Sequence, residues 1–451
     1  MKSEPQLASP RNLQLDFFRG LALIVIFVNH MPGNPWFHFT PSRLGPSDAA
    51  ETFVFLSGCA AALAFGRSLS QAGIVLGSLR VLQRCAQIYL AHLALFILMT
   101  CLFASTATLD MLEAHSQFDS LDYFFDHTRE AVIALISLRY VPNFIDILPM
   151  YLVILFWLPT FWALSRIHIA LSMACSIGLY LTARRLGWEL PADPISGRAW
   201  FFNPFCWQLI FFTGFSIGSG WLPVPGRHRG LIWLCVSFAV FCFPLENPLG
   251  YRNFPWFDDL RQTWSPWLDK SHLGLLRYAH FLAIAYLVNV LLINRQHWLR
   301  TRLANHVVGM GQQSLPIFIL GTGLSFIGGL MLDGNHADLS FSALINLAGI
   351  GLMMLSAHAL NWLDRKPWKQ GNYRPDATSG MAWPRQAAMT LGLLLLSIAP
   401  LQLLQSEQDT NELATAPSAD LVITLPENQP PKPEEASFQL QDNSLESSDT
   451  L

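Results

Sequence analysis

Two ionisable side chains in the first apolar segment have the types and the spacing that catalysis requires. Arg19 and His30 lie in LQLDFFRGLALIVIFVNH, eleven positions apart. That is about three turns of a helix, so the two side chains share one face about 16 Å apart. Charges inside apolar spans are costly and indicate function, and an imidazole suits a general base. Asp16, one turn before Arg19, is a further candidate for the substrate site. Alternatively, Arg19 reaches the lipid headgroups and His30 only ends the helix.

A pair of carboxylates stands at the start of the second apolar segment. Asp48 and Glu51 occur in PSDAAETFVFLSG, and their spacing puts them on the same side of a helix. An antiparallel neighbour of the first segment holds them near the level of His30, where a carboxylate orients an imidazole. His30, Glu51 and Asp48 are therefore the candidate catalytic residues. The alternative is a capping box, in which Ser47 or Asp48 caps the helix and Glu51 is its partner.

Two arginines precede the third apolar segment. Arg80 and Arg84 occur in LRVLQRCAQIYLAH, one helical turn apart. Paired guanidinium groups bind phosphates in a bidentate manner, so both are candidate substrate-binding residues together with Arg19. Basic residues that anchor a span on the cytosolic side of a membrane have the same pattern.

Further polar side chains interrupt later apolar segments. Arg277 and His280 occur in LGLLRYAHFLA, and Asn203 and Gln208 occur in FFNPFCWQLIFFTG. We include these four among the candidate substrate-binding residues, because together they suggest a polar cavity inside a bundle of helices. Hydrogen bonding between helices explains each of them equally well when taken alone. Other such positions are Asp146, Gln312, Gln313 and Ser314.

The composition indicates that these residues belong to a membrane protein. Apolar residues make up 52% of the 451 residues and charged residues 13%, whereas a globular chain carries about 25% charged residues. A helix needs roughly 17–25 apolar residues to cross a bilayer, and we therefore predict an all-α transmembrane bundle of about 10–11 spans. The predicted spans are 13–30, 49–66, 84–105, 144–164, 168–186, 205–220, 230–244, 276–294, 314–332, 340–362 and 386–404.

The distribution of basic residues predicts the orientation of the chain. Lys and Arg concentrate in the connections that lie inside if the N-terminus is cytosolic, such as 295–313, whereas 106–130 has six carboxylates and one arginine. Residues 1–12 are then the cytosolic N-terminus and 13–405 the transmembrane domain. Residues 406–451 are rich in Ser, Glu, Asp, Gln and Pro, which predicts a disordered acidic tail.

Several other classes of site are not indicated. The seven cysteines lie in apolar segments without a CxxC pair, so they suit buried thiols better than disulfides or metal ligands. There is no GxSxG, P-loop, dinucleotide fingerprint or HExxH motif. The net charge of −3 and the lack of a basic cluster argue against a nucleic-acid partner. We expect no metal and no bound cofactor.

These segments resemble the OpgC family, membrane proteins associated with the succinylation of osmoregulated periplasmic glucans. The resemblance runs from about residue 12 to about residue 362. It rests on DFFRGLALIVIFVNH, ETFVFLSG, LPMYLVILF, NPFCWQLIF, LGLLRYAHFLA and GQQSLPIF. More distantly, Arg19 and His30 are similar to the arginine–histidine motif of the membrane acyltransferase type 3 superfamily. Arg80 and Arg84 depart from the RxxR spacing common in that superfamily.

The resemblance implies that His30 is catalytic in a multi-pass protein of the bacterial inner membrane. It also implies that the donor substrate is a cytosolic acyl-CoA, in particular succinyl-CoA, and that the acceptor is a periplasmic glucan. The other expected partner of the protein is membrane lipid. Two other classes stay open. A secondary transporter of an organic anion or a saccharide has midplane polar residues and helix breaks, and a membrane scaffold recruits a partner through its acidic tail.

Overall fold

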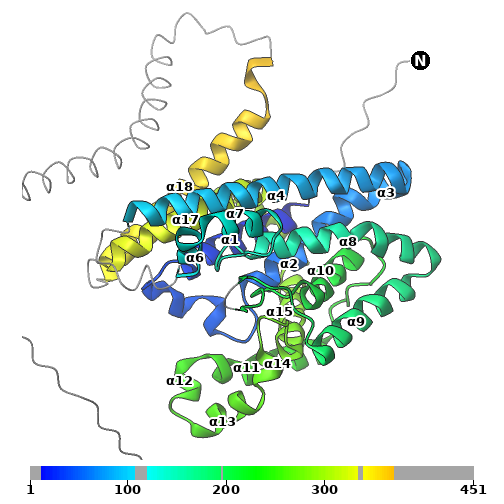
Figure 1. Cartoon of the computed structure of the whole chain (residues 1–451). Helices are drawn as coiled ribbons and strands as arrows, with labels where there is room; N and C mark the ends of the chain where they lie inside the picture. The colour runs from blue at the N-terminus through cyan, green and yellow to red at the C-terminus, as the bar shows by residue number, and fades with distance from the viewer. Residues whose placement is uncertain (1–11, 107–118, 195–196, 334–338, 370–451) are drawn as a thin grey trace, which may run out of the picture. The chain divides into compact units, whose positions relative to one another are not determined.

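The computed structural model describes residues 12–106, 119–194, 197–333 and 339–369 (Figure 1). These residues form helices and connecting turns, and the β structure among them is an isolated bridge between Pro191 and Ala199. The predicted all-α class is confirmed. The predicted span 386–404, the boundary at 405 and the tail 406–451 lie outside the described residues.

Seven helices of the described chain are long and apolar enough to cross a membrane, so the chain is a multi-pass membrane protein. Each overlaps a predicted span, including the short one at 230–244. They are α2 continued through η3 and α3 (Ala49–Gln71), α4 (Gly73–Thr106), α8 (Ile147–Ile167), α11 (Arg229–Glu246), α15 (Leu275–Leu292), α17 (Ser314–Asp333) and α18 (Leu339–Asp364).

The remaining helices are shorter or less apolar. Three of them match the predicted spans at 13–30, 168–186 and 205–220 without reaching the length and apolarity of the seven. They are α1 (Leu13–Asn29), α9 (Ile169–Leu186) and α10 (Pro204–Gly218). The others are α6 (Asp122–Asp126), α7 (Thr128–Ile136), α12 (Pro248–Tyr251), α13 (Pro255–Thr263), α14 (Ser265–Leu268) and α16 (Arg302–Gln312), with the 3₁₀ turns η1 (Pro35–Phe39), η2 (Pro41–Arg43), η4 (Asp119–Leu121), η5 (Gln296–Arg300) and η6 (Pro367–Lys369).

The third span begins earlier than we predicted. We predicted that 67–83 is a connection, but α3 covers its start and α4 begins at Gly73. Gly73 has φ +83°, a left-handed conformation that glycine adopts without steric cost. The chain can therefore turn at this residue and resume as a helix at once. Arg80 and Arg84 are the eighth and twelfth residues of α4.

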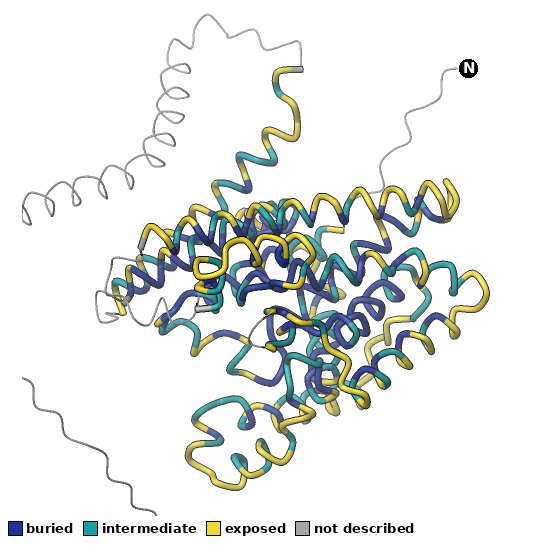
Figure 2. The backbone as a smooth tube through the Cα atoms, viewed as in Figure 1, coloured by how far each residue is buried: buried dark blue, intermediate teal, exposed yellow. Residues whose placement is uncertain are grey.

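The outward sides of the long helices carry apolar side chains. Leu79, Leu90 and Ile97 on α4 and Leu347 on α18 are exposed, and Figure 2 shows the exposed residues along the outer side of α4. Such a row is unfavourable in water but matches the hydrocarbon of a bilayer. These faces are therefore the lipid-facing surface of the bundle.

Two close helix pairs hold the inner part of the bundle together. A Cβ at Gly58 of α2 would collide with the carbonyl of Phe211 on α10, and a Cβ at Gly20 of α1 would collide with the carbonyl of Val307 on α16. Glycines at helix interfaces allow the backbones to approach this closely. The pairs α2–α10 and α1–α16 thus fix the positions of the first two apolar segments, which carry the candidate catalytic residues.

Candidate active site

His30 directly follows α1 and caps its C-terminus. Its backbone N–H donates to the carbonyl of Ile26 at 2.9 Å, so the imidazole is held at the last turn of the helix. The Nδ1 atom of His30 is buried and has no hydrogen-bond partner among the described residues. A buried polar atom without a partner is uncommon and marks a position where a ligand or water completes the site.

The ring of Phe144 packs against the imidazole edge-to-face. The ring centroids are 5.1 Å apart and the planes are inclined by 76°. Phe144 has φ +66°, which is a costly conformation for a bulky side chain and persists only where the surroundings enforce it. The strained residue and the unpartnered imidazole thus meet at one point, beside the start of α8.

Glu51 and Arg277 form a buried ion pair between α2 and α15. The Nε and Nη2 atoms of Arg277 are each 2.7 Å from Oε1 of Glu51. The other oxygen of Glu51 accepts from the backbone N–H of Asp48 at 2.8 Å. Glu51 is fully buried. Its two oxygens therefore serve both as the capping-box partner and as the counter-ion of Arg277.

Asp48 caps α2 and also binds Lys270, which lies between α14 and α15. Its Oδ2 is 2.7 Å from Nζ of Lys270 and 3.6 Å from Nη2 of Arg277, and its Oδ1 accepts from the N–H of Ala50 at 2.8 Å. Burial alone raises the pKa of a carboxyl group, but the charges of Lys270 and Arg277 hold the pKa of Asp48 well below its usual range. Asp48 is therefore ionised in the folded protein.

We had expected Asp48 or Glu51 to orient His30, but in the structure both carboxylates have other partners. Among the described residues, neither Asp48 nor Glu51 is hydrogen-bonded to His30. Lys270 and Asp48 act on His30 through their charges, so the ion cluster and the imidazole still belong to one region. The cluster of Asp48, Glu51, Lys270 and Arg277 contains two negative and two positive groups, which balances its charge.

His280 lies one turn after Arg277 on the same buried face of α15. Its Nδ1 is 2.7 Å from the hydroxyl of Ser47, and its Nε2 is buried without a partner in the described part of the chain. A Cβ at Gly45 would collide with this imidazole. The segment before α2 thus packs directly on His280.

At the other end of α1, Arg19 lines a basic cavity of about 350 Å³. Its Nη2 donates to the hydroxyl of Ser314 at 2.5 Å, while its Nε is buried and has no hydrogen-bond partner among the residues described. Arg80 and Arg84 of α4 line the same cavity, with Tyr151 of α8. Three arginines from two helices therefore line one space, which suits an anionic ligand.

The end of α2 and a π-helical turn also line this cavity. The cavity is lined there by Ala60, Ala61, Ala64 and Phe65, and η3 (Ala62–Gly66) is the π turn between α2 and α3. Insertions of this kind in a helix recur at functional sites.

We had expected Asn203 and Gln208 to line a polar cavity together with Arg277 and His280. In the structure, these two amides are instead hydrogen-bonded within the protein. Asn203 caps α10 and donates to the carbonyl of Trp188 at 2.6 Å. Gln208 is buried between α10 and α9, where it exchanges hydrogen bonds with Ser176. Both amides are thus occupied by the protein. Asp16 lies in the first turn of α1, where its charge acts on Arg19.

Four residues of this region were not among the candidate site residues. Lys270, Phe144, Tyr151 and Ser314 all contact or influence a candidate residue. Only Ser314 had a signal in the sequence, as a polar residue next to two glutamines at the start of an apolar segment. Among the residues that the structure describes, no group of three His, Cys, Asp or Glu side chains is arranged to hold a metal ion.

A family model described as "OpgC protein" matches residues 11–365, which is most of the chain and includes every candidate residue. No curated protein and no solved structure matches the chain. The matched range begins just before α1 and ends after α18, so it spans the described bundle with both the basic cavity and His30.

Proposed function

This chain belongs to the OpgC family, and we propose that it transfers an acyl group from cytosolic acyl-CoA to hydroxyl groups of periplasmic glucans. The family is associated with the modification of periplasmic glucans. The group transferred is succinyl or a similar acyl group. The observation that carries this proposal is the arrangement along α1, which has a cavity lined by three arginines at one end and an unpartnered imidazole at the other.

The basic cavity is the binding site for the donor. Coenzyme A carries phosphate groups, and guanidinium groups bind phosphates through charge-assisted hydrogen bonds. Arg80 and Arg84 approach the cavity from α4, and Arg19 lies deeper, on Ser314. The excess of basic residues at this end of the bundle supports its cytosolic location, where acyl-CoA is found.

The unpartnered imidazole is the general base. His30 takes the proton from a glucan hydroxyl, and the hydroxyl oxygen attacks the carbonyl carbon of the thioester. The tetrahedral intermediate collapses, the carbon–sulfur bond breaks, and the thiolate of CoA takes up the proton from the imidazolium. The products are a glucan ester and free CoA. Arg19 and His30 are about 16 Å apart along α1, a distance that the pantetheine arm of CoA spans.

The ion cluster positions the groups around His30. Glu51 and Arg277 tie α2 to α15, and Asp48 holds Lys270, whose charge acts on His30. A fixed positive charge at this point stabilises the oxyanion that forms on the thioester carbonyl. Glu51 and Asp48 are in this scheme positioning residues rather than direct partners of His30.

The proposal is tested by expressing the chain in cells that lack their own glucan acyltransferase. Extracted periplasmic glucans are analysed by mass spectrometry, and we expect an added mass that corresponds to succinyl or a related acyl group. Membranes from these cells release free CoA from acyl-CoA only when glucan is present. A secondary transporter instead moves the intact substrate without consuming the thioester. Unmodified glucans and no release of CoA, despite normal amounts of protein in the membrane, contradict the proposal.

A further inference from the structure

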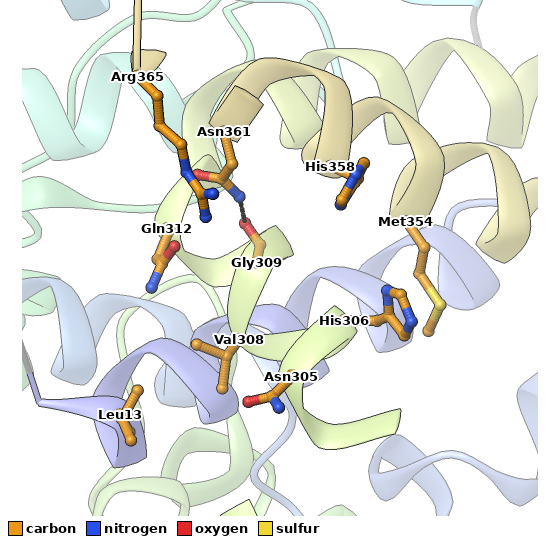
Figure 3. A pocket seen from close by; sticks show the side chains of 10 residues that line it. All are labelled: Leu13, Asn305, His306, Val308, Gly309, Gln312, Met354, His358, Asn361 and Arg365. Carbon is orange, nitrogen blue, oxygen red and sulfur yellow. Dashed lines mark hydrogen bonds between the residues drawn. The ribbon is translucent and has the colours of Figure 1, made fainter. Parts of the chain in front are cut away.

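A second polar cavity lies between α1, α16 and α18, apart from the residues assigned to acyl transfer. It has a volume of about 230 Å³. Its polar lining residues are Asn305, His306, Gln312, His358, Asn361 and Arg365. Figure 3 shows His306 and His358 on one side of this space and Arg365 above Gln312 on the other. None of the lining residues is acidic.

The side chains that line this second cavity are suited to an anion. Arg365 provides a permanent positive charge, and the imidazole and amide groups provide N–H donors. The amide of Asn361 is fixed in orientation, because it donates to the carbonyl of Gly309 at 3.1 Å and accepts from Gln313 at 3.0 Å. A neighbouring carboxylate, Asp364, is engaged by Gln313 at 2.6 Å and does not line the cavity.

The surroundings indicate the depth of this cavity in the membrane. Trp298 and Trp362 are exposed next to the elements that line it, and Trp368 is exposed just beyond α18. Exposed tryptophans of membrane proteins concentrate at the level of the lipid headgroups. The segment from Arg295 to Arg302 and the end of α18 are also rich in basic residues. The cavity therefore opens at the headgroup level of the leaflet that we predict to be cytosolic.

The cavity also has an apolar side. Leu13 and Met354 belong to its lining, and the adjacent outward side of α18 exposes Leu352 and Leu355. A ligand in this cavity contacts N–H donors and the guanidinium group of Arg365 at the membrane surface. Below these groups it contacts apolar side chains. A phospholipid combines these two properties, whereas a soluble phosphate compound uses only the first.

We propose that this cavity binds the phosphate of an anionic phospholipid from the leaflet on the basic side of the protein. The headgroup phosphate lies between Arg365 and the two imidazoles, and the acyl chains follow α18. The site is distinct from the arginine cavity at Arg19, so this inference stands independently of the acyl transfer reaction. A bound lipid joins α1, α16 and α18, which come from distant parts of the chain, and stabilises the folded bundle.

The test uses the full-length protein, purified in detergent and freed of lipid. Phosphatidylglycerol, phosphatidylcholine or inorganic phosphate is added, and native mass spectrometry and thermal unfolding report binding. We expect phosphatidylglycerol to be retained and to raise the Tm more than phosphatidylcholine. Arg365→Gln should weaken its binding by about tenfold, because a hydrogen bond to a charged group is lost. His358→Ala, at an exposed position, should weaken it as well.

Arg302→Gln is the matched control, because it removes one exposed positive charge at the same end of the bundle without changing the lining of the cavity. Its affinity for phosphatidylglycerol should equal that of the wild type. An equal loss in Arg302→Gln, or equal binding of phosphatidylcholine, would show that the lipid binds without this site. An Arg365-dependent shift with inorganic phosphate and none with phosphatidylglycerol would overturn the assignment to a lipid.

Discussion

Replacing Glu51 by glutamine tests whether the buried ion pair holds α2 against α15. Glu51 is fully buried, and both contacts of Arg277 with it are 2.7 Å long. Glutamine keeps the size of the side chain but leaves the guanidinium group without its nearest counter-charge. Removing one partner of a buried pair costs about 3–5 kcal/mol. The carboxylate of Asp48, 3.6 Å from Arg277, compensates in part, so we expect a loss near 3 kcal/mol, the lower end of that range.

The assay is equilibrium unfolding of the purified protein in mixed micelles, followed by tryptophan fluorescence. A loss of 3 kcal/mol corresponds to a change of about 150-fold in the unfolding equilibrium. The double variant Glu51→Gln/Arg277→Met leaves no unpaired charge, so its loss should be smaller than the sum of the single losses by about 2 kcal/mol. Lys270→Met is the matched control. Its side chain is 33% exposed, whereas that of Arg277 is 7% exposed. Arg277 also stays 3.6 Å from Asp48 after this change, so we expect a smaller loss than in Glu51→Gln.

Two results would refute this reasoning. One is a Glu51→Gln protein whose free energy of unfolding lies within about 1 kcal/mol of the wild type, the usual effect of an ordinary substitution. The other is a double variant whose loss equals the sum of the single losses, because the two residues would then act independently.

Two further predictions concern the loop before α15 and the arginine cavity. The hydrogen bond with Asp269, at 2.6 Å, raises the pKa of His272. The interaction therefore stabilises the folded protein fully at pH values below the unfolded pKa of about 6.5. This stabilisation is lost as the pH rises through the higher pKa that His272 has in the folded protein. His272→Gln should therefore lower the Tm at pH 5.5 more than at pH 8.5, and a loss that is the same at every pH would contradict this. Arg84→Gln should raise the KM for acyl-CoA by about tenfold, since a charge-assisted hydrogen bond to phosphate is lost, while Arg166→Gln, exposed at the same end of the bundle, should not. Initial rates of CoA release measure both variants, and equal KM values would remove Arg84 from the donor site.

The spans and the capping of α2 could be predicted because both depend on local sequence. A run of apolar residues long enough for a bilayer is visible without knowing its neighbours, and α4, α8, α11, α15, α17 and α18 each overlap such a run. The spacing of Asp48 and Glu51 indicated a capping box, and the structure has one. The early start of α4 was missed, because Arg80 in its first half was assigned to a connection on the cytosolic side.

The partners of the buried charges could not be predicted, because they come from segments far apart along the chain. Glu51 and Arg277 are 226 positions apart, and nothing in either segment indicates the other. Lys270 lies in a connection that sequence patterns do not distinguish from an ordinary loop. The expected contact between His30 and a carboxylate relied on the levels of two neighbouring helices. Such reasoning brings residues into one region but does not determine which of them form hydrogen bonds.

The most direct test of the proposed function is acyl transfer by His30→Ala, compared with His38→Ala. His38 is an exposed histidine in η1, close in sequence but outside the cluster around α1. The purified proteins are reconstituted in vesicles with labelled succinyl-CoA and periplasmic glucan, and labelled glucan ester is measured over time. The account predicts that His38→Ala keeps the wild-type rate and that His30→Ala loses at least about a hundredfold, the usual contribution of a general base. Wild-type rates in a folded His30→Ala protein would contradict the assignment of the base.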